Sequence, residues 1–170
     1  MNVKLKRITY TALFVAVIAV ISQIAIPMPS LVPITLQTFA ICLCGYFLGL
    51  RGGVSAILVY VLLGAMGAPV FSSFQGGFSV ILGHGGGFIV GFIPLALMCG
   101  ISKKRISAIV LGCLGICICH LMGTAWYMII TKNPFIPSFV LVSLPYIVKD
   151  IILCILAYFV AEKLKTKIKI

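Results

Sequence analysis

Two adjacent charged residues, Lys149 and Asp150, lie near the middle of an otherwise uncharged, apolar stretch over residues 139–161. A charge inside a bilayer costs at least ~2.5 kcal/mol, so such residues usually face a polar cavity or a charged partner. Neighbours on a helix project about 100° apart, and a shared polar cavity would suit both side chains. We therefore predict that this pair binds a ligand. The alternative is that the two charges only neutralise each other and orient helices.

A second candidate is the uncharged loop over residues 69–78, which contains the amide side chain of Gln75 followed by Gly76 and Gly77. An amide both donates and accepts hydrogen bonds, and a loop of this kind can close over a site as a lid. It could equally be an ordinary glycine-rich loop. His84 follows it and could titrate or bind a ligand, or simply be a hydrogen-bonded histidine at the start of a helix.

Most catalytic chemistry is excluded by what the chain lacks. Its only two carboxylates are Asp150 and Glu162, and the sequence contains no Walker A loop, no H-E-x-x-H and no G-x-S-x-G. A lone buried acid does not supply the acid and base pair that most hydrolytic mechanisms use. We therefore expect no enzymatic activity, no cofactor and no energy source within the chain.

The seven cysteines all fall inside predicted apolar helices. Cys113 and Cys117 share a helical face, and Cys117 with Cys119 forms a C-x-C pattern, which is compatible with a metal site. Small apolar side chains packed between helices explain them more simply, and we predict no metal site. The seven are Cys42, Cys44, Cys99, Cys113, Cys117, Cys119 and Cys154.

The elements that must position these residues are membrane helices. The chain is 62% hydrophobic with a mean hydropathy of +1.28, too apolar for a soluble core covered by polar surface. A spanning helix needs roughly 20 apolar residues, and the sequence predicts an all-α bundle of six such helices in one domain over residues 1–170. The predicted helices are Ile8–Ile26, Pro33–Leu50, Val54–Pro69, Ser79–Gly100, Ile106–Ile130 and Phe139–Ala161, with a turn at Arg51-Gly52-Gly53 between the second and third.

The cationic residues predict the orientation of this bundle in the cell membrane. Eleven of the thirteen Lys and Arg residues form four clusters that six helices would place on one side, and cytoplasmic ends of membrane helices are enriched in these residues. Both termini are therefore expected in the cytoplasm. Because the cations flank apolar segments, the net charge of +11 does not predict a nucleic-acid partner. The clusters are Lys4, Lys6 and Arg7; Arg51; Lys103, Lys104 and Arg105; and Lys163, Lys165, Lys167 and Lys169.

Small residues at helical spacing predict where helices approach one another. Gly83, Gly87 and Gly91 form a G-x-x-x-G-x-x-x-G face, which we interpret as a packing surface. Ala12 and Ala16 form a similar pair in the first helix, and that pair could contact another helix of this chain or a helix of a partner subunit.

In order and spacing, these and further motifs resemble the biotin-binding S component (BioY type) of energy-coupling-factor vitamin transporters. The resemblance covers nearly the whole chain. It implies six membrane helices, capture of a vitamin from outside, and dependence on a transmembrane coupling subunit and two cytoplasmic ATPases. The motifs are Val32-Pro33-Ile34-Thr35-Leu36-Gln37, Leu63-Gly64-Ala65-Met66-Gly67-Ala68-Pro69-Val70-Phe71, Gly76-Gly77 with Gly83-x-x-Gly86-Gly87-Phe88, Gly123-x-x-Trp126, and Pro145 before Asp150.

The resemblance also implies roles for individual residues. Gln75 and Phe88 stand where the family has an asparagine and often a tyrosine, and Asp150 matches a family aspartate. The family's lysine three positions later is replaced by Leu153 here, so we hypothesise that Lys149, one helical turn before it, returns the ammonium to the same place. The resemblance implies that Ala12 and Ala16 contact the coupling subunit. Their spacing matches the alanine motif by which the first helix of the family meets that subunit.

Two alternatives remain open from the sequence. The missing lysine and tyrosine would permit another small heterocyclic vitamin as the ligand. A membrane enzyme or assembly subunit that binds no ligand would use the Lys149 and Asp150 pair only to orient helices.

Overall fold

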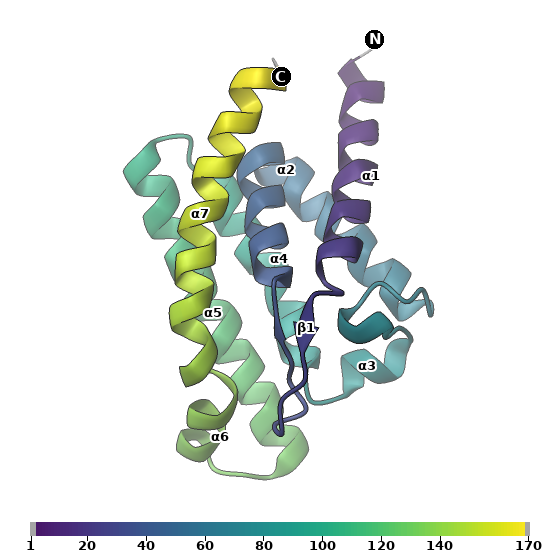
Figure 1. Ribbon diagram of the computed structural model, residues 1–170, viewed down its shortest axis with the longest axis vertical. Coiled ribbons are helices and arrows are strands. Elements are labelled where there is room, and N and C mark those ends of the chain that lie inside the picture. Colours follow the sequence, from purple (N-terminus) through teal and green to yellow (C-terminus); the bar gives the residue numbers. More distant parts are fainter. Residues whose placement is uncertain (1–2, 169–170) are drawn as a thin grey trace.

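The computed structural model describes residues 3–168 and shows a predominantly helical bundle (Figure 1). Lys169 and the side chain of Lys4, both counted in the cationic clusters, lie outside the described residues. The elements are α1 (Val3–Ile21), β1 (Ala25–Ile26), β2 (Ile34–Thr35), α2 (Gln37–Ala65), the 3-10 helix η1 (Ser72–Phe74), α3 (Phe78–Leu82), α4 (Gly86–Ile101), α5 (Arg105–Thr131), α6 (Phe135–Val142) and α7 (Leu144–Ile168).

Three of these helices, α2, α5 and α7, are long and apolar enough to cross a membrane. The shorter α4 is also apolar. Many large apolar side chains on the outside of the bundle are exposed, including Val110 and Ile152 at 52% and 60%. Such a surface suits a bilayer rather than water, in agreement with the composition.

The predicted second and third helices form one element, α2, with a sharp kink at Gly49 (φ 70°, ψ −177°). This backbone conformation is essentially restricted to glycine. The predicted turn at residues 51–53 is therefore misplaced, because Gly52 and Gly53 are helical and buried. A Cβ on Gly53 would lie 2.9 Å from the Cα of Gly45, so the two halves of α2 approach each other closely.

Three other predicted helices are shorter or interrupted. The first ends at Ile21 rather than Ile26, because residues 25–26 pair antiparallel with residues 34–35. The predicted helix 79–100 is broken between α3 and α4 at residues 83–85. The predicted helix 139–161 is divided at Ser143, because Pro145 has no N–H to donate to the carbonyl four residues earlier and so cannot continue the helix across this point.

The core lies where α2, α4, α5 and α7 meet, and close backbone approach there depends on glycine. A Cβ on Gly87 would lie 2.6 Å from the Met122 carbonyl oxygen, and one on Gly91 would lie 2.9 Å from Cys119 Sγ. Both contacts are with α5, so these two glycines pack as predicted. Gly83 does not belong to this face, because it lies in the break between α3 and α4.

The first turn of α1 and the last turn of α7 lie at the same end of the bundle (Figure 1). The connection between β1 and β2 and the short helix α6 lie at the other end. The bundle therefore has one end that carries the first turn of α1 and the last turn of α7, and another that carries the β1–β2 connection and α6.

Candidate functional site

A cavity of about 640 Å³ lies among the β1–β2 connection, the loop that contains η1, and helices α2 to α5 and α7. The four predicted ligand-binding residues, Gln75, Phe88, Lys149 and Asp150, all line it. Ligand pockets typically measure about 300–1,000 Å³, so this cavity is of ordinary size for a small molecule. Its lining segments lie toward the end of the bundle opposite the termini (Figure 1).

Lys149 and Asp150 form an ion pair at the wall of this cavity. Lys149 Nζ lies 2.7 Å from Asp150 Oδ1, and the two side chains are 28% and 7% exposed. The ammonium donates a hydrogen bond of 2.7 Å to the Thr35 carbonyl oxygen. Asp150 Oδ1 is in ionic contact with this ammonium, is buried, and accepts no hydrogen bond from the described residues, so it is an unsatisfied acceptor. Leu153, one turn later, is not among the described residues that line the cavity.

The second carboxylate oxygen of Asp150 contacts a histidine that the sequence analysis did not select as a site residue. His120 Nε2 lies 3.1 Å from Asp150 Oδ2, and its Nδ1 lies 3.1 Å from Ser143 Oγ. Ser143 Oγ in turn lies 2.7 Å from Thr124 Oγ1. All four residues are buried, and this chain of hydrogen bonds fixes the carboxylate from the side away from Lys149.

A signal for His120 was present in the sequence. The residue lies in the middle of the predicted helix 106–130, and an ionisable residue there marks a functional site in its own right. The contact with Asp150, in contrast, depends on the packing of α5 against α7.

The loop after α2 covers the cavity and is held by buried polar groups. The Val70 carbonyl accepts hydrogen bonds of 2.8 Å from Tyr60 Oη and 2.7 Å from Ser22 Oγ. Gln23 Oε1 accepts one of 2.7 Å from the Phe74 N–H. Phe71, only 1% exposed, packs edge-on against Tyr60. The base of the predicted lid is therefore anchored to the core, whereas Gln75 at its far end is exposed.

The β1–β2 connection forms another part of the cavity wall. Tyr146 Oη donates a hydrogen bond of 2.7 Å to the Val32 carbonyl oxygen, tying this connection to α7. Gln37 Nε2 donates a 2.7 Å hydrogen bond to Tyr60 Oη, which also binds the lid at Val70. One polar network thus joins α2, the lid loop and the cavity wall.

Aromatic and aliphatic side chains supply much of the remaining lining. Phe88 is half-buried and packs edge-on against the His120 ring, with 5.6 Å between ring centroids. Phe92, Ile89 and Ile116 add apolar surface. His84 also lines the cavity, and its ring lies 5.8 Å from that of Tyr127. The cavity therefore combines a charged pair at one wall with both apolar and uncharged polar side chains elsewhere, as expected for a heterocyclic ligand.

The predicted docking residues lie away from this cavity. Ala12 and Ala16 are exposed on the outer face of α1, so among the described residues they do not pack inside the bundle. Ala16 borders a shallow apolar groove together with Val17, Val20 and Ile21. The intramolecular packing that the sequence left open for this pair is therefore not observed in the described bundle.

Comparison with known proteins identifies close relatives over the whole chain. The sequence matches the BioY family over residues 1–170. The probable biotin transporter BioY of Pyrococcus horikoshii is 36% identical over 162 residues, covering 95% of this chain and 98% of that protein. The biotin transporter BioY of Thermotoga maritima is 36% identical over 168 residues, covering 95% of this chain and 96% of its own. The crystal structure of the S-component for biotin from an ECF-type ABC transporter matches with a TM-score of 0.89 at 25% identity, covering 98% of this chain and 95% of that one.

Proposed function

Because the chain belongs to the BioY family, we propose that it is the biotin-binding S component of an ECF-type vitamin uptake transporter. It is a multi-pass protein of the cell membrane. The observation that carries the proposal is the ion pair of Lys149 and Asp150 at the wall of a cavity of about 640 Å³.

The chemistry of biotin matches the polar wall of the cavity. Its bicyclic urea has one carbonyl acceptor and two N–H donors. The Lys149 ammonium, on a side chain that is 28% exposed, can donate to that carbonyl, and the Asp150 carboxylate can accept from an N–H after a rotation that exposes its buried Oδ1. The sulfur-containing ring then meets Phe88 and its aliphatic neighbours, an environment that suits an apolar ring.

The valerate tail of biotin is assigned to the lid side of the cavity. No Arg lines the cavity among the described residues, so the carboxylate has no guanidinium partner there. The exposed amide of Gln75 and the backbone N–H groups of the glycine-rich loop are suitable donors. Solvent at the outer mouth completes the hydration of the carboxylate.

The topology of this proposal has six membrane crossings, formed by α1, the two halves of α2, α4, α5 and α7. Both termini then lie in the cytoplasm with the cationic clusters, in keeping with the enrichment of Lys and Arg on that side. The cavity lies toward the opposite end of the bundle, where it can receive a vitamin from outside (Figure 1). C-terminal fusions to a reporter that is active only in the cytoplasm and to one active only outside test this orientation.

A transmembrane coupling subunit and a pair of cytoplasmic ATPases supply the energy in this proposal, since the chain contains no Walker A loop. The exposed pair Ala12 and Ala16 provides a small-residue surface on which a helix of the coupling subunit can pack closely. Ala16→Trp should abolish co-purification of the complex. Val110→Trp, at an exposed position of α5, is the matched control and should leave the complex intact.

Equilibrium binding to the purified protein tests the ligand. We expect saturable binding of biotin and displacement of labelled biotin by unlabelled biotin, but not by equal concentrations of other vitamins. Displacement by a different heterocyclic vitamin at lower concentration would reassign the cargo. Absence of binding to every vitamin would instead favour an assembly subunit or enzyme.

A further inference from the structure

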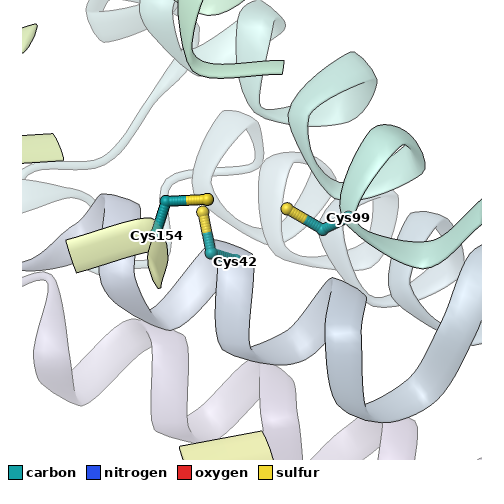
Figure 2. Close-up of side chains that lie close together, drawn as sticks. All are labelled: Cys42, Cys99 and Cys154. Carbon is teal, nitrogen blue, oxygen red and sulfur yellow. The ribbon is translucent and has the colours of Figure 1, made fainter. Parts of the chain in front are cut away.

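Three cysteine side chains from different helices converge in the core, apart from the cysteines that the sequence analysis considered for a metal site. Cys42 lies in α2, Cys99 in α4 and Cys154 in α7. Their Sγ atoms all lie within 4.8 Å of one another, and the residues are 0%, 1% and 0% exposed. Figure 2 shows the Cys42 and Cys154 sulfurs close together, with the Cys99 sulfur directed at them from the other side.

The spacing suits three-coordinate binding of a metal ion. A thiolate binds a first-row d10 ion at about 2.3 Å, so three sulfurs in a trigonal plane around one ion lie about 4 Å apart. The observed limit of 4.8 Å is close to this value, and small rotations of the side chains close the difference. Because the cluster contains only sulfur donors, it favours soft cations over Mg²⁺ or Ca²⁺, which take oxygen ligands.

A neighbouring hydroxyl group can stabilise the charge of a bound thiolate. Tyr46 Oη lies 3.2 Å from Cys154 Sγ and 3.3 Å from the Ala108 carbonyl oxygen. When the sulfur is a thiolate, the phenol O–H can donate to it, and hydrogen bonds to an ionised acceptor are among the stronger ones. The cluster therefore has a built partner beyond its three sulfurs.

The cluster adjoins the large cavity on the side of the termini. Cys154 lies one helical turn after Asp150, and Cys42 lies one turn after Thr38, and both of these earlier residues line the cavity.

We propose that Cys42, Cys99 and Cys154 form a three-thiolate site for a soft d10 cation such as Cu(I) or Cd²⁺. The ion replaces the three thiol protons, which are released to solvent, so binding strengthens as pH rises. The inference does not depend on biotin as the cargo, because it uses a separate cluster of side chains. A bound ion would join α2, α4 and α7 next to the polar wall of the cavity, on the side of the termini.

Titration of the purified, reduced protein with Cd²⁺ tests the site, with the ultraviolet sulfur-to-cadmium charge-transfer absorption as the readout. We expect one Cd²⁺ per chain in this band, with three sulfur neighbours by X-ray absorption spectroscopy. Loss of a residue that only supports a metal ligand typically weakens metal binding ~10- to 100-fold. Cys42→Ser and Cys99→Ser each remove a ligand itself, so each should weaken Cd²⁺ binding by at least that factor. Cys117→Ser, which changes an exposed cysteine of α5, should leave the titration unchanged.

Two results would overturn the proposal. One is the absence of the charge-transfer band at saturating Cd²⁺, which would leave the cluster as three packed thiols. The other is an unchanged titration in a Cys99→Ala protein that elutes and melts like the wild type. If either single Ser variant fails to fold, X-ray absorption on the wild type decides the question, because fewer than three sulfur neighbours contradicts the site.

Discussion

Replacement of Lys149 by methionine tests the role of the ion pair most sharply. The substitution keeps most of the side-chain volume but removes the ammonium, which lies 2.7 Å from Asp150 Oδ1 and 2.7 Å from the Thr35 carbonyl oxygen. Asp150, with a side chain only 7% exposed, then keeps only His120 as a charged or hydrogen-bonding partner among the described residues. A biotin carbonyl in the cavity also loses the donor that we assign to it.

The size of the effect follows from the burial of the two groups. Breaking a fully buried ion pair costs about 3–5 kcal/mol, but the Lys149 side chain is 28% exposed and solvent screens its charge. A hydrogen bond to a charged group contributes about 1.5–3 kcal/mol. We therefore expect Lys149→Met to weaken biotin binding by about 1–3 kcal/mol, or roughly 5- to 150-fold.

Isothermal titration calorimetry of wild type and variant measures this difference. Lys132→Met is the matched control, because Lys132 is an exposed cation that does not line the cavity, and such changes usually stay within about 0.5 kcal/mol. In Lys149→Met with Leu153→Lys, the lysine lies where the family has it, and we expect part of the affinity to return. A Lys149→Met protein that binds biotin as tightly as wild type would refute the reasoning.

Three further variants address other parts of the account. His120→Ala leaves Asp150 Oδ2 without its hydrogen bond and should lower the free energy of unfolding by about 1–3 kcal/mol. The control His84→Ala should have a smaller effect, and equal melting temperatures for the two variants would contradict this prediction. Gln75→Ala should weaken biotin binding by about 0.5–1.5 kcal/mol. Because the side chain is exposed, the melting temperature of the free protein should not change. Unchanged affinity for biotin would show that Gln75 does not belong to the site. Gly49→Ala should destabilise the bundle by about 1–3 kcal/mol, since a side chain rarely adopts φ 70° with ψ −177°, and a wild-type melting curve would count against the observed kink.

The polar part of the site could be predicted because charge is conspicuous in an apolar sequence. Lys149 and Asp150 stand out in the last apolar stretch, and Gln75 and Phe88 follow from the order of the family motifs. The same reasoning applied to His120 would have found it. The contact between His120 and Asp150 depends on how α5 packs against α7. The spacing of residues within one helix does not determine that packing.

The helix boundaries were harder to predict, because glycine and proline permit a break without fixing its position. Gly49, Gly52 and Gly53 all allow a turn, but only Gly49 adopts the non-helical conformation. The division at Ser143 had a local signal in Pro145. The pairing of residues 25–26 with 34–35, and the convergence of the three cysteines from α2, α4 and α7, arise only from tertiary packing.

The central claim is that this chain binds biotin in the cavity bordered by Lys149 and Asp150. The most direct measurement is the melting temperature of the purified protein as biotin is added, in parallel for wild type and Asp150→Asn. Biotin at 100 times its Kd should add about 2.7 kcal/mol to the stability of the wild type, and the same concentration should stabilise the variant much less. No stabilisation of the wild type at micromolar biotin, or equal stabilisation of both proteins, would contradict the account.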